Sequence, residues 1–240
     1  MSQVIGKTLW FYGTNCHEET MHALSRVGAL PDLVLLSQLI DGSKRLFECD
    51  ILVIPGGFSF GDDQAAGRIA AIDLTYRLRD QLVEVVARRI PIICICNGFQ
   101  IVVEMGLLPG DGEIGKPTAV LDHNLTARFE HWAEVSVFLH EPPGVNCVWT
   151  KGLDGLEIKM PAAHGQGRLV PFNGLESCNV IATYGPGAGD STYIGDGGFS
   201  PNGSAIAGIG TDVIAGFMPH PERAGEAGLA IFEAGVNSVR

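Results

Sequence analysis

Short, almost wholly apolar runs that alternate with segments of helical periodicity constrain the fold of this chain most. The runs at 8–13, 32–37, 50–57 and 90–96 are predicted to be strands, and helical spacing marks 17–28, 65–89 (with a break) and 98–106. Strands that are apolar on both faces must be covered on both, and alternation with helices makes them parallel. The sequence predicts an α/β protein with a flavodoxin-like mixed, mostly parallel sheet and helices on both faces.

The pattern changes after Leu107, where apolar and polar residues alternate more and turns join the runs. The segments 131–140, 179–185, 203–211 and 212–218 are predicted to be mainly antiparallel strands that flank the parallel core, and 225–239 is predicted to be a closing helix. We find neither a linker nor an internal repeat. We therefore expect a single domain over residues 1–240.

Charge and cysteine usage argue against several classes of protein. A net charge of −11 disfavours a basic nucleic-acid-binding face, and no run approaches the ~18 apolar residues of a membrane span. The six cysteines form no C-x-x-C pair, which disfavours a structural zinc site, so we expect no metal. Because the N-terminal residues lack the apolar core of a signal peptide, we expect reduced thiols and a cytoplasmic location.

The stretch IPIICICNGFQIVVEMG (90–106) ends an apolar run at Cys96 and then turns through Asn97 and Gly98 into a predicted helix. A strand that ends on a nucleophile and turns into a helix through small residues is a nucleophile elbow. The turn exposes the side chain, and the free N–H groups of the helix start favour a thiolate. Alternatively, Cys96 is simply a small buried residue of a central strand.

Two other predicted strands end on residues that would complete such a site. Pro55, Gly56 and Gly57 follow one strand, where a free glycine N–H could form an oxyanion hole with the N–H of Asn97. In GFMPHPERA (216–224), His220 lies between two prolines and Glu222 follows at the spacing that, in an extended segment, puts both side chains on one side. The alternative for Pro55-Gly56-Gly57 is a plain turn. The alternative for the His220 segment is a surface loop with an isolated histidine.

Parallel α/β sheets bind their ligands at the carboxyl ends of their strands. Cys96, His220 and Glu222 at that edge form a coherent cysteine triad for acyl transfer. The segments ICNGFQI, PGGFSFGD and MPHPERA together resemble the class I (triad) glutamine amidotransferases, and among them the glutaminase subunits of phosphoribosylformylglycinamidine synthase. GTNCHEE (13–19), ARFEHW (127–132), AHGQGR (163–168) and PNGS (201–204) extend this resemblance over nearly the whole chain.

The resemblance implies a nucleophile at Cys96, a base at His220 and an orienting carboxylate at Glu222. It further implies an oxyanion hole at Gly57 and Asn97, and a substrate-binding site that includes Gly56, Gln100 and, as one alternative to a structural or interface role, His164. It implies glutamine hydrolysis through a thioester. Ammonia would pass to a separate large synthetase subunit of purine biosynthesis that uses ATP and Mg²⁺, with a small accessory subunit as a further partner. This chain would need no cofactor.

The chain departs from the family pattern at three places. Cys94 replaces the glycine that usually opens the elbow, Gln166 replaces the glutamate of H-G-E-G, and Asp63-Gln64 stands where the family is often apolar. Two other functions stay open. One is a DJ-1/PfpI-like cysteine hydrolase or chaperone, which shares the elbow but lacks P-H-P-E. The other is a non-enzymatic regulatory subunit, which the intact Cys96, His220 and Glu222 disfavour.

Overall fold

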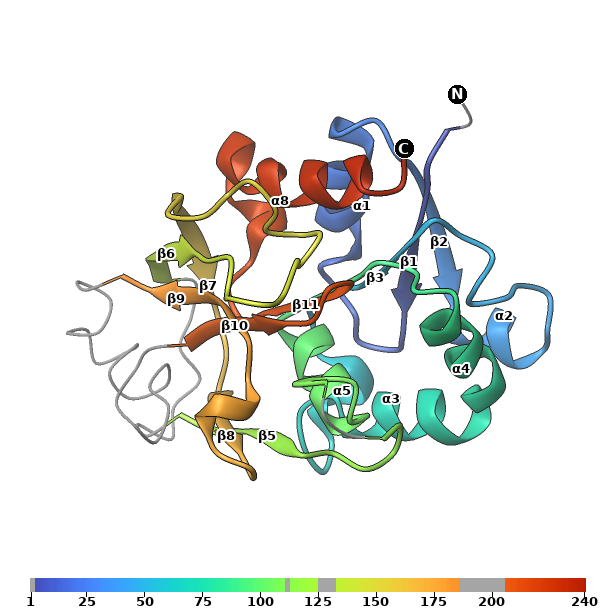
Figure 1. Cartoon of the computed structure of the whole chain (residues 1–240). Coiled ribbons are helices and arrows are strands. Elements are labelled where there is room, and N and C mark those ends of the chain that lie inside the picture. The colour runs from blue at the N-terminus through green and yellow to red at the C-terminus, as the bar shows by residue number, and fades with distance from the viewer. Residues whose placement is uncertain (1–2, 111–112, 125–132, 186–205) are drawn as a thin grey trace.

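The computed structural model describes residues 3–110, 113–124, 133–185 and 206–240. Nine strands form one sheet in the order β2-β1-β3-β4-β11-β10-β9-β6-β7 (Figure 1). Their bounds in that order are Leu30–Leu35, Ile5–Trp10, Ile51–Ile54, Ile92–Ile95, Ile214–Phe217, Ile206–Gly210, Val180–Tyr184, Ala133–Leu139 and Glu157–Ala162. The first five are parallel, and every later neighbour is antiparallel. A separate antiparallel pair contains β5 (Ala119–His123) and β8 (Gln166–Pro171).

Helices cover both faces of the parallel part of the sheet. Figure 1 shows α1 (His17–Arg26) and α8 (Gly225–Asn237) on one face, and α3 (Arg68–Ile72), α4 (Arg79–Ala87) and α5 (Asn97–Glu104) on the other. A short helix, α2 (Leu36–Ile40), follows β2. Single helical turns lie at Ser59–Asp62, Leu175–Ser177 and Pro221–Arg223, and a π-helical turn at Asp73–Arg77 joins α3 to α4. None of the helices within the described ranges is long and apolar enough to cross a membrane.

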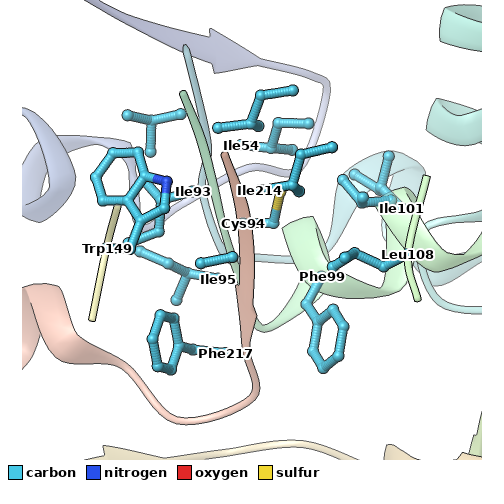
Figure 2. Close-up of a cluster of buried hydrophobic side chains, with 14 of the residues drawn as sticks. Ile54, Ile93, Cys94, Ile95, Phe99, Ile101, Leu108, Trp149, Ile214 and Phe217 are labelled. Atoms are coloured by element: carbon cyan, nitrogen blue, oxygen red, sulfur yellow. The ribbon is translucent and has the colours of Figure 1, made fainter. Parts of the chain in front are cut away.

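The centre of the sheet is the apolar strand β4, all of whose residues are buried between β3 and β11. Figure 2 shows Ile93 and Ile95 on the side of Trp149, while Cys94 lies on the other side, toward Phe99 and Ile101 of α5. Close helix packing there depends on a glycine of β11, because a Cβ at Gly216 would lie 2.2 Å from the Phe99 ring. The strand that carries the candidate nucleophile is therefore tightly packed on both faces.

The predicted fold class is confirmed, and the predicted strands and helices of the first half lie within a few residues of the observed ones. The break expected in 65–89 is the π-helical turn between α3 and α4. The prediction for 212–218 was wrong in part. A tight turn after Gly210 makes β11 antiparallel to β10, and its other edge pairs in parallel with β4.

Four elements were not predicted from the sequence, namely β5, β7, β8 and α2. Two segments that carried part of the family resemblance, 127–132 and 201–204, lie wholly or almost wholly outside the described residues.

Candidate active site

Cys96 stands at a sharp turn between β4 and α5. Its backbone has φ 50° and ψ −108°, a conformation that residues with side chains rarely adopt, and α5 begins at the next residue. The turn presses Gly98 so closely against β3 that a Cβ there would lie 1.9 Å from the carbonyl oxygen of Ile54. The local strain and the obligatory glycine together hold the Cys96 side chain above the end of the sheet, as the sequence predicts for an elbow.

The two cysteines of this stretch have different environments. Cys96 is 7% exposed, lines a cavity, and its thiol donates a hydrogen bond to the carbonyl oxygen of Ala163 at 3.4 Å. Cys94 is fully buried beneath α5, and that burial raises the pKa of its thiol well above the ordinary value. The cysteine that replaces the usual glycine of the elbow is thus a packing residue, kept protonated by its apolar surroundings.

His220 and Glu222 form a buried pair at the end of β11. The His220 Nδ1 lies 2.6 Å from the Glu222 Oε1, and the backbone N–H of His220 is anchored to the carbonyl of Pro161 at 2.8 Å. The expectation of an extended His-x-Glu segment was wrong, because Glu222 lies in the helical turn Pro221–Arg223. Proline at the first position favours that turn, which curls the carboxylate back to Nδ1.

The charge state of His220 depends on opposing effects. Burial alone would lower the pKa of the imidazole, but the Glu222 carboxylate, the nearby Cys96, and hydrogen bonds with Cys16 and Cys96 together raise it well above its ordinary value. A carboxylate on Nδ1 also fixes the tautomer, which leaves Nε2 to exchange a proton with the thiol. This arrangement favours the imidazolium form of His220 beside the Cys96 sulfur.

Cys16 is a second thiol of the site, and its role was not foreseen although it lies in the GTNCHEE motif. Its thiol donates to Asn15 Oδ1 at 3.3 Å, and Arg223 Nη2 donates to its sulfur at 3.5 Å. Ligand atoms of Cys16, His220 and Glu222 all lie within 4.8 Å of one another, the grouping of a potential metal site. In this structure the Glu222 carboxylate contacts His220 Nδ1, and the positively charged Arg223 side chain contacts the Cys16 sulfur. Both potential ligand atoms therefore already have partners within the protein.

The two glycines after β3 lie against the triad and the loop beside it. A Cβ at Gly56 would lie 2.8 Å from the His220 ring and 3.4 Å from the Cys96 Cβ, so a larger residue there would have to displace the imidazole. Gly57 has φ +136°, and none of the hydrogen bonds among the described residues uses its N–H. Asn97 is the first residue of α5, so its N–H has no acceptor within the helix. Two donors are thus available beside the nucleophile.

A chain of polar side chains forms one wall of the site. The Asn97 amide donates to Gln100 Oε1 at 3.0 Å and to Asp62 Oδ1 at 2.9 Å, while its oxygen accepts from the N–H of Ser59 at 3.1 Å. Gln100 in turn donates to the carbonyl of Gln166 at 2.6 Å. The sequence predicts a role for the Asn97 backbone only. Its side chain, which ties the loop after β3 to the elbow, was missed.

His164 is a buried neutral histidine of the same site. Burial, and next the charge of His220, lower its pKa to about 3. Its Nδ1 lies 3.2 Å from Asn124 Oδ1, and the Asn124 amide donates to its backbone carbonyl at 2.9 Å. Gly167 packs on the ring, where a Cβ would lie 2.4 Å away. His164 therefore lines the site as a fixed, uncharged imidazole, held by an asparagine that no sequence motif had indicated.

One cavity of about 680 Å³ joins these residues. Of the predicted site residues, five line it directly: Gly57, Cys96, Gln100, His164 and His220. The others contact the lining residues, as the preceding distances show. Gln166 also lines the cavity, where its Oε1 accepts from the N–H of Ala66 at 2.9 Å and its Nε2 lies 3.1 Å from His123 Nε2. The departure at Gln166 thus lies inside the site and places a neutral amide there.

Comparisons with known proteins agree with this geometry. A family model described as the CobB/CobQ-like glutamine amidotransferase domain matches residues 7–230. The chain is 37% identical over 232 residues to phosphoribosylformylglycinamidine synthase subunit PurQ of Treponema denticola, an alignment that covers 88% of this chain and 84% of that protein. It is 34% identical to the subunit of the same name from Pyrococcus furiosus, with 96% of both chains covered.

A solved structure described as PurLQS from Thermotoga maritima contains a chain of the same fold. That chain is 28% identical, has a TM-score of 0.78 and is covered completely, as is this one. The family expected from the sequence motifs is therefore confirmed by sequence and by structure. With most of its length aligned to those relatives, this chain belongs to the PurQ family of glutamine amidotransferases.

Proposed function

We propose that this chain hydrolyses L-glutamine through a thioester at Cys96 and supplies the ammonia to a synthetase subunit that converts formylglycinamide ribonucleotide to formylglycinamidine ribonucleotide. The observation that carries the proposal is the strained elbow of Cys96 in one cavity with His220, whose Nδ1 lies 2.6 Å from the Glu222 carboxylate. The names of the relatives supply the pathway, since they are subunits of phosphoribosylformylglycinamidine synthase.

In the first half of the reaction, His220 takes the thiol proton and the Cys96 sulfur attacks the side-chain carbonyl carbon of glutamine. The oxygen becomes negative and accepts hydrogen bonds from the N–H groups of Gly57 and Asn97. The carbon–nitrogen bond then breaks, and His220 returns the proton to the leaving nitrogen, which departs as ammonia. Glu222 stays ionised and stabilises the imidazolium. A glutamyl thioester remains on Cys96.

In the second half, water attacks the thioester carbon while His220 accepts its proton. The carbon–sulfur bond breaks, the thiolate recovers the proton through His220, and glutamate leaves. Gln100 lies on the wall of the cavity one helical turn after Cys96, where its amide can hold the substrate. Gly56, which touches both the imidazole and the elbow, keeps the site narrow enough for this transfer.

The acceptor of ammonia is a partner protein. We propose a large synthetase subunit that uses ATP and Mg²⁺, with a small accessory subunit in the same assembly, and no cofactor in this chain. The likeness to a chain of PurLQS from Thermotoga maritima supports an assembly of this kind. We further propose a single domain over 1–240 and a cytoplasmic location, which suits six free cysteines.

The test is glutamate formation from L-glutamine by the full chain, with and without the synthetase subunit, ATP, Mg²⁺ and ribonucleotide. We expect glutamate to form and the ribonucleotide to be aminated, and Cys96→Ala to abolish both. A chain that forms no glutamate under either condition, yet keeps a reactive Cys96, would instead support the DJ-1/PfpI-like hydrolase or chaperone, which the comparisons do not favour.

A further inference from the structure

The loop after β3 has a backbone that a plain connection does not need. Phe60, Asp62 and Gln64 all have positive φ, at 54°, 53° and 69°, although none is glycine. Such a backbone conformation is unfavourable for residues with side chains, and strain of this kind collects at ligand sites. Asp62 and Gln64 both line the active-site cavity. The loop therefore keeps Asp62 and Gln64 at the cavity although their backbone conformation is unfavourable.

We propose that Asp62 is the receptor for the α-ammonium group of the amino-acid substrate. The inference rests on the proposed glutaminase function and adds a subsite to it. Glutamine is a zwitterion, so a pocket that selects it from simple amides needs an anion for the ammonium group. Among the described residues that line the cavity, Asp62 is the only one with a carboxylate.

Asp62 is held by a residue of the nucleophile elbow. Its Oδ1 accepts from the Asn97 amide at 2.9 Å, and Asn97 follows Cys96 directly in the chain. The carboxylate is thus tied to the residue that follows the nucleophile, and Asp62 and Cys96 line the same cavity. The same Asn97 amide holds Gln100, so the ammonium and the rest of the substrate would share one wall.

Within the described part of the chain, the Asp62 carboxylate has no cationic partner. No salt bridge between described residues involves Asp62, and its contacts are hydrogen bonds from Asn97 and from the N–H of Gly67. Partial burial raises its pKa to about 6, because these two bonds only partly replace the lost hydration. An ammonium group placed against the carboxylate would complete the pair and restore the charged form.

The test compares L-glutamine with glutaramate, the same molecule without the α-amino group, in hydrolysis by the full chain with its synthetase partner. We expect the wild type to prefer glutamine by at least about tenfold in kcat/KM. Asp62→Asn should raise KM for glutamine about 10- to 100-fold, the scale of one charged hydrogen bond, and leave glutaramate almost unaffected. Asp80→Asn is the control, because this exposed carboxylate of α4 lies outside both the cavity and the loop that carries Asp62.

Two outcomes would overturn the inference. One is a wild type that hydrolyses glutaramate as well as glutamine, which needs no variant and so does not depend on whether Asp62→Asn folds. The other is an Asp62→Asn variant that loses both substrates equally or keeps the wild-type preference, since that pattern marks a structural residue. Glutamine hydrolysis by the wild type supports the proposed function whatever the Asp62→Asn variant does.

Discussion

At the scale of single residues, burial and backbone direction distinguish two thiols that are only two positions apart. Cys94 is enclosed by the apolar contact between β4 and α5 and has a raised pKa, whereas Cys96 lines the cavity beside an imidazole. We expect a glutamine-analogue electrophile to label Cys96, as peptide mass analysis would show. Cys94→Ala should keep the label, and labelling chiefly at Cys94 would contradict the elbow assignment.

The buried His220–Glu222 pair predicts unequal effects of two substitutions. His220→Ala removes the proton carrier, so we expect glutamine turnover to fall on the order of 10³-fold or more. Glu222→Ala leaves the imidazole in place with water as a substitute partner, and should cost less. Steady-state glutaminase kinetics of both variants, with thermal unfolding as the folding control, measure this. A near-normal kcat for His220→Ala would contradict the triad.

His164 predicts how the stability of the fold depends on pH. Its pKa is about 3 in the folded protein and about 6.5 when unfolded, so between these values the unfolded chain binds more protons. The contribution of His164 to the free energy of unfolding is therefore greatest above pH 6.5, and it decreases as the pH falls toward 3. We expect the thermal midpoint of the wild type to fall more between about pH 7 and pH 4.5 than that of His164→Asn. Equal falls in both proteins would place the acid-sensitive groups elsewhere.

At the scale of elements, the end of β3 sets the width of the site. An alanine methyl at Gly56 would meet the His220 ring at 2.8 Å, and because Gly56 does not have a positive φ, the backbone itself tolerates alanine. We expect Gly56→Ala to lower kcat at least about tenfold by displacing the imidazole, with a small change in unfolding temperature. Gly61→Ala tests the opposite case, since its methyl meets no atom within 4 Å but its φ of +72° strains the alanine backbone. Unchanged kcat in Gly56→Ala would show that the imidazole has room to move.

The same scale shows what the sequence could and could not predict. Strands such as β3 and β4 are apolar throughout because both faces are covered, so composition alone reveals them. By contrast, β7 and β8 mix polar residues and proline with apolar ones. Among the strands that the structure describes, β7 lies at an edge of the large sheet and β8 pairs with β5 alone. Their pairing is determined by distant partners, and no local pattern records it.

For the site, the sequence motifs predicted the residues that take part in the proposed reaction, but not the side chains that hold those residues in place. Cys96, His220 and Gly57 follow strand ends, where sheet topology implies proximity. Asn97 and Asn124 act through bonds to residues 35 and 40 positions away, and Cys16 approaches His220 only because the start of α1 lies beside the turn after β11. Contacts of that range depend on the completed fold, which a single sequence does not display.

At the scale of the whole molecule, the cavity lies at the strand ends, where a partner must receive ammonia. A glutaminase that feeds a synthetase gains nothing from hydrolysis on its own, so we expect the isolated chain to have low activity that rises on docking. A partner can raise activity only by favouring the active arrangement over an inactive one. The moving part we expect is the Gly56-Gly57 peptide, where Gly57 has φ +136° and its N–H has no intramolecular bond among the described residues.

Loss of that one oxyanion donor would account for a roughly 10²-fold deficit in the isolated chain. We expect the docking face to include the strained loop 58–63 and the 164–168 segment, both of which contribute residues to the cavity lining. Ala66, three residues after that loop, donates its N–H to Gln166 Oε1. The measurement is kcat for glutamine hydrolysis by the isolated chain, then with saturating synthetase, its nucleotide and its ribonucleotide. The Phe58 side chain is exposed, so Phe58→Ala should reduce the increase in kcat that a limiting concentration of synthetase produces. Full activity in isolation, unchanged by the partner, would contradict the coupling and indicate a free-standing hydrolase.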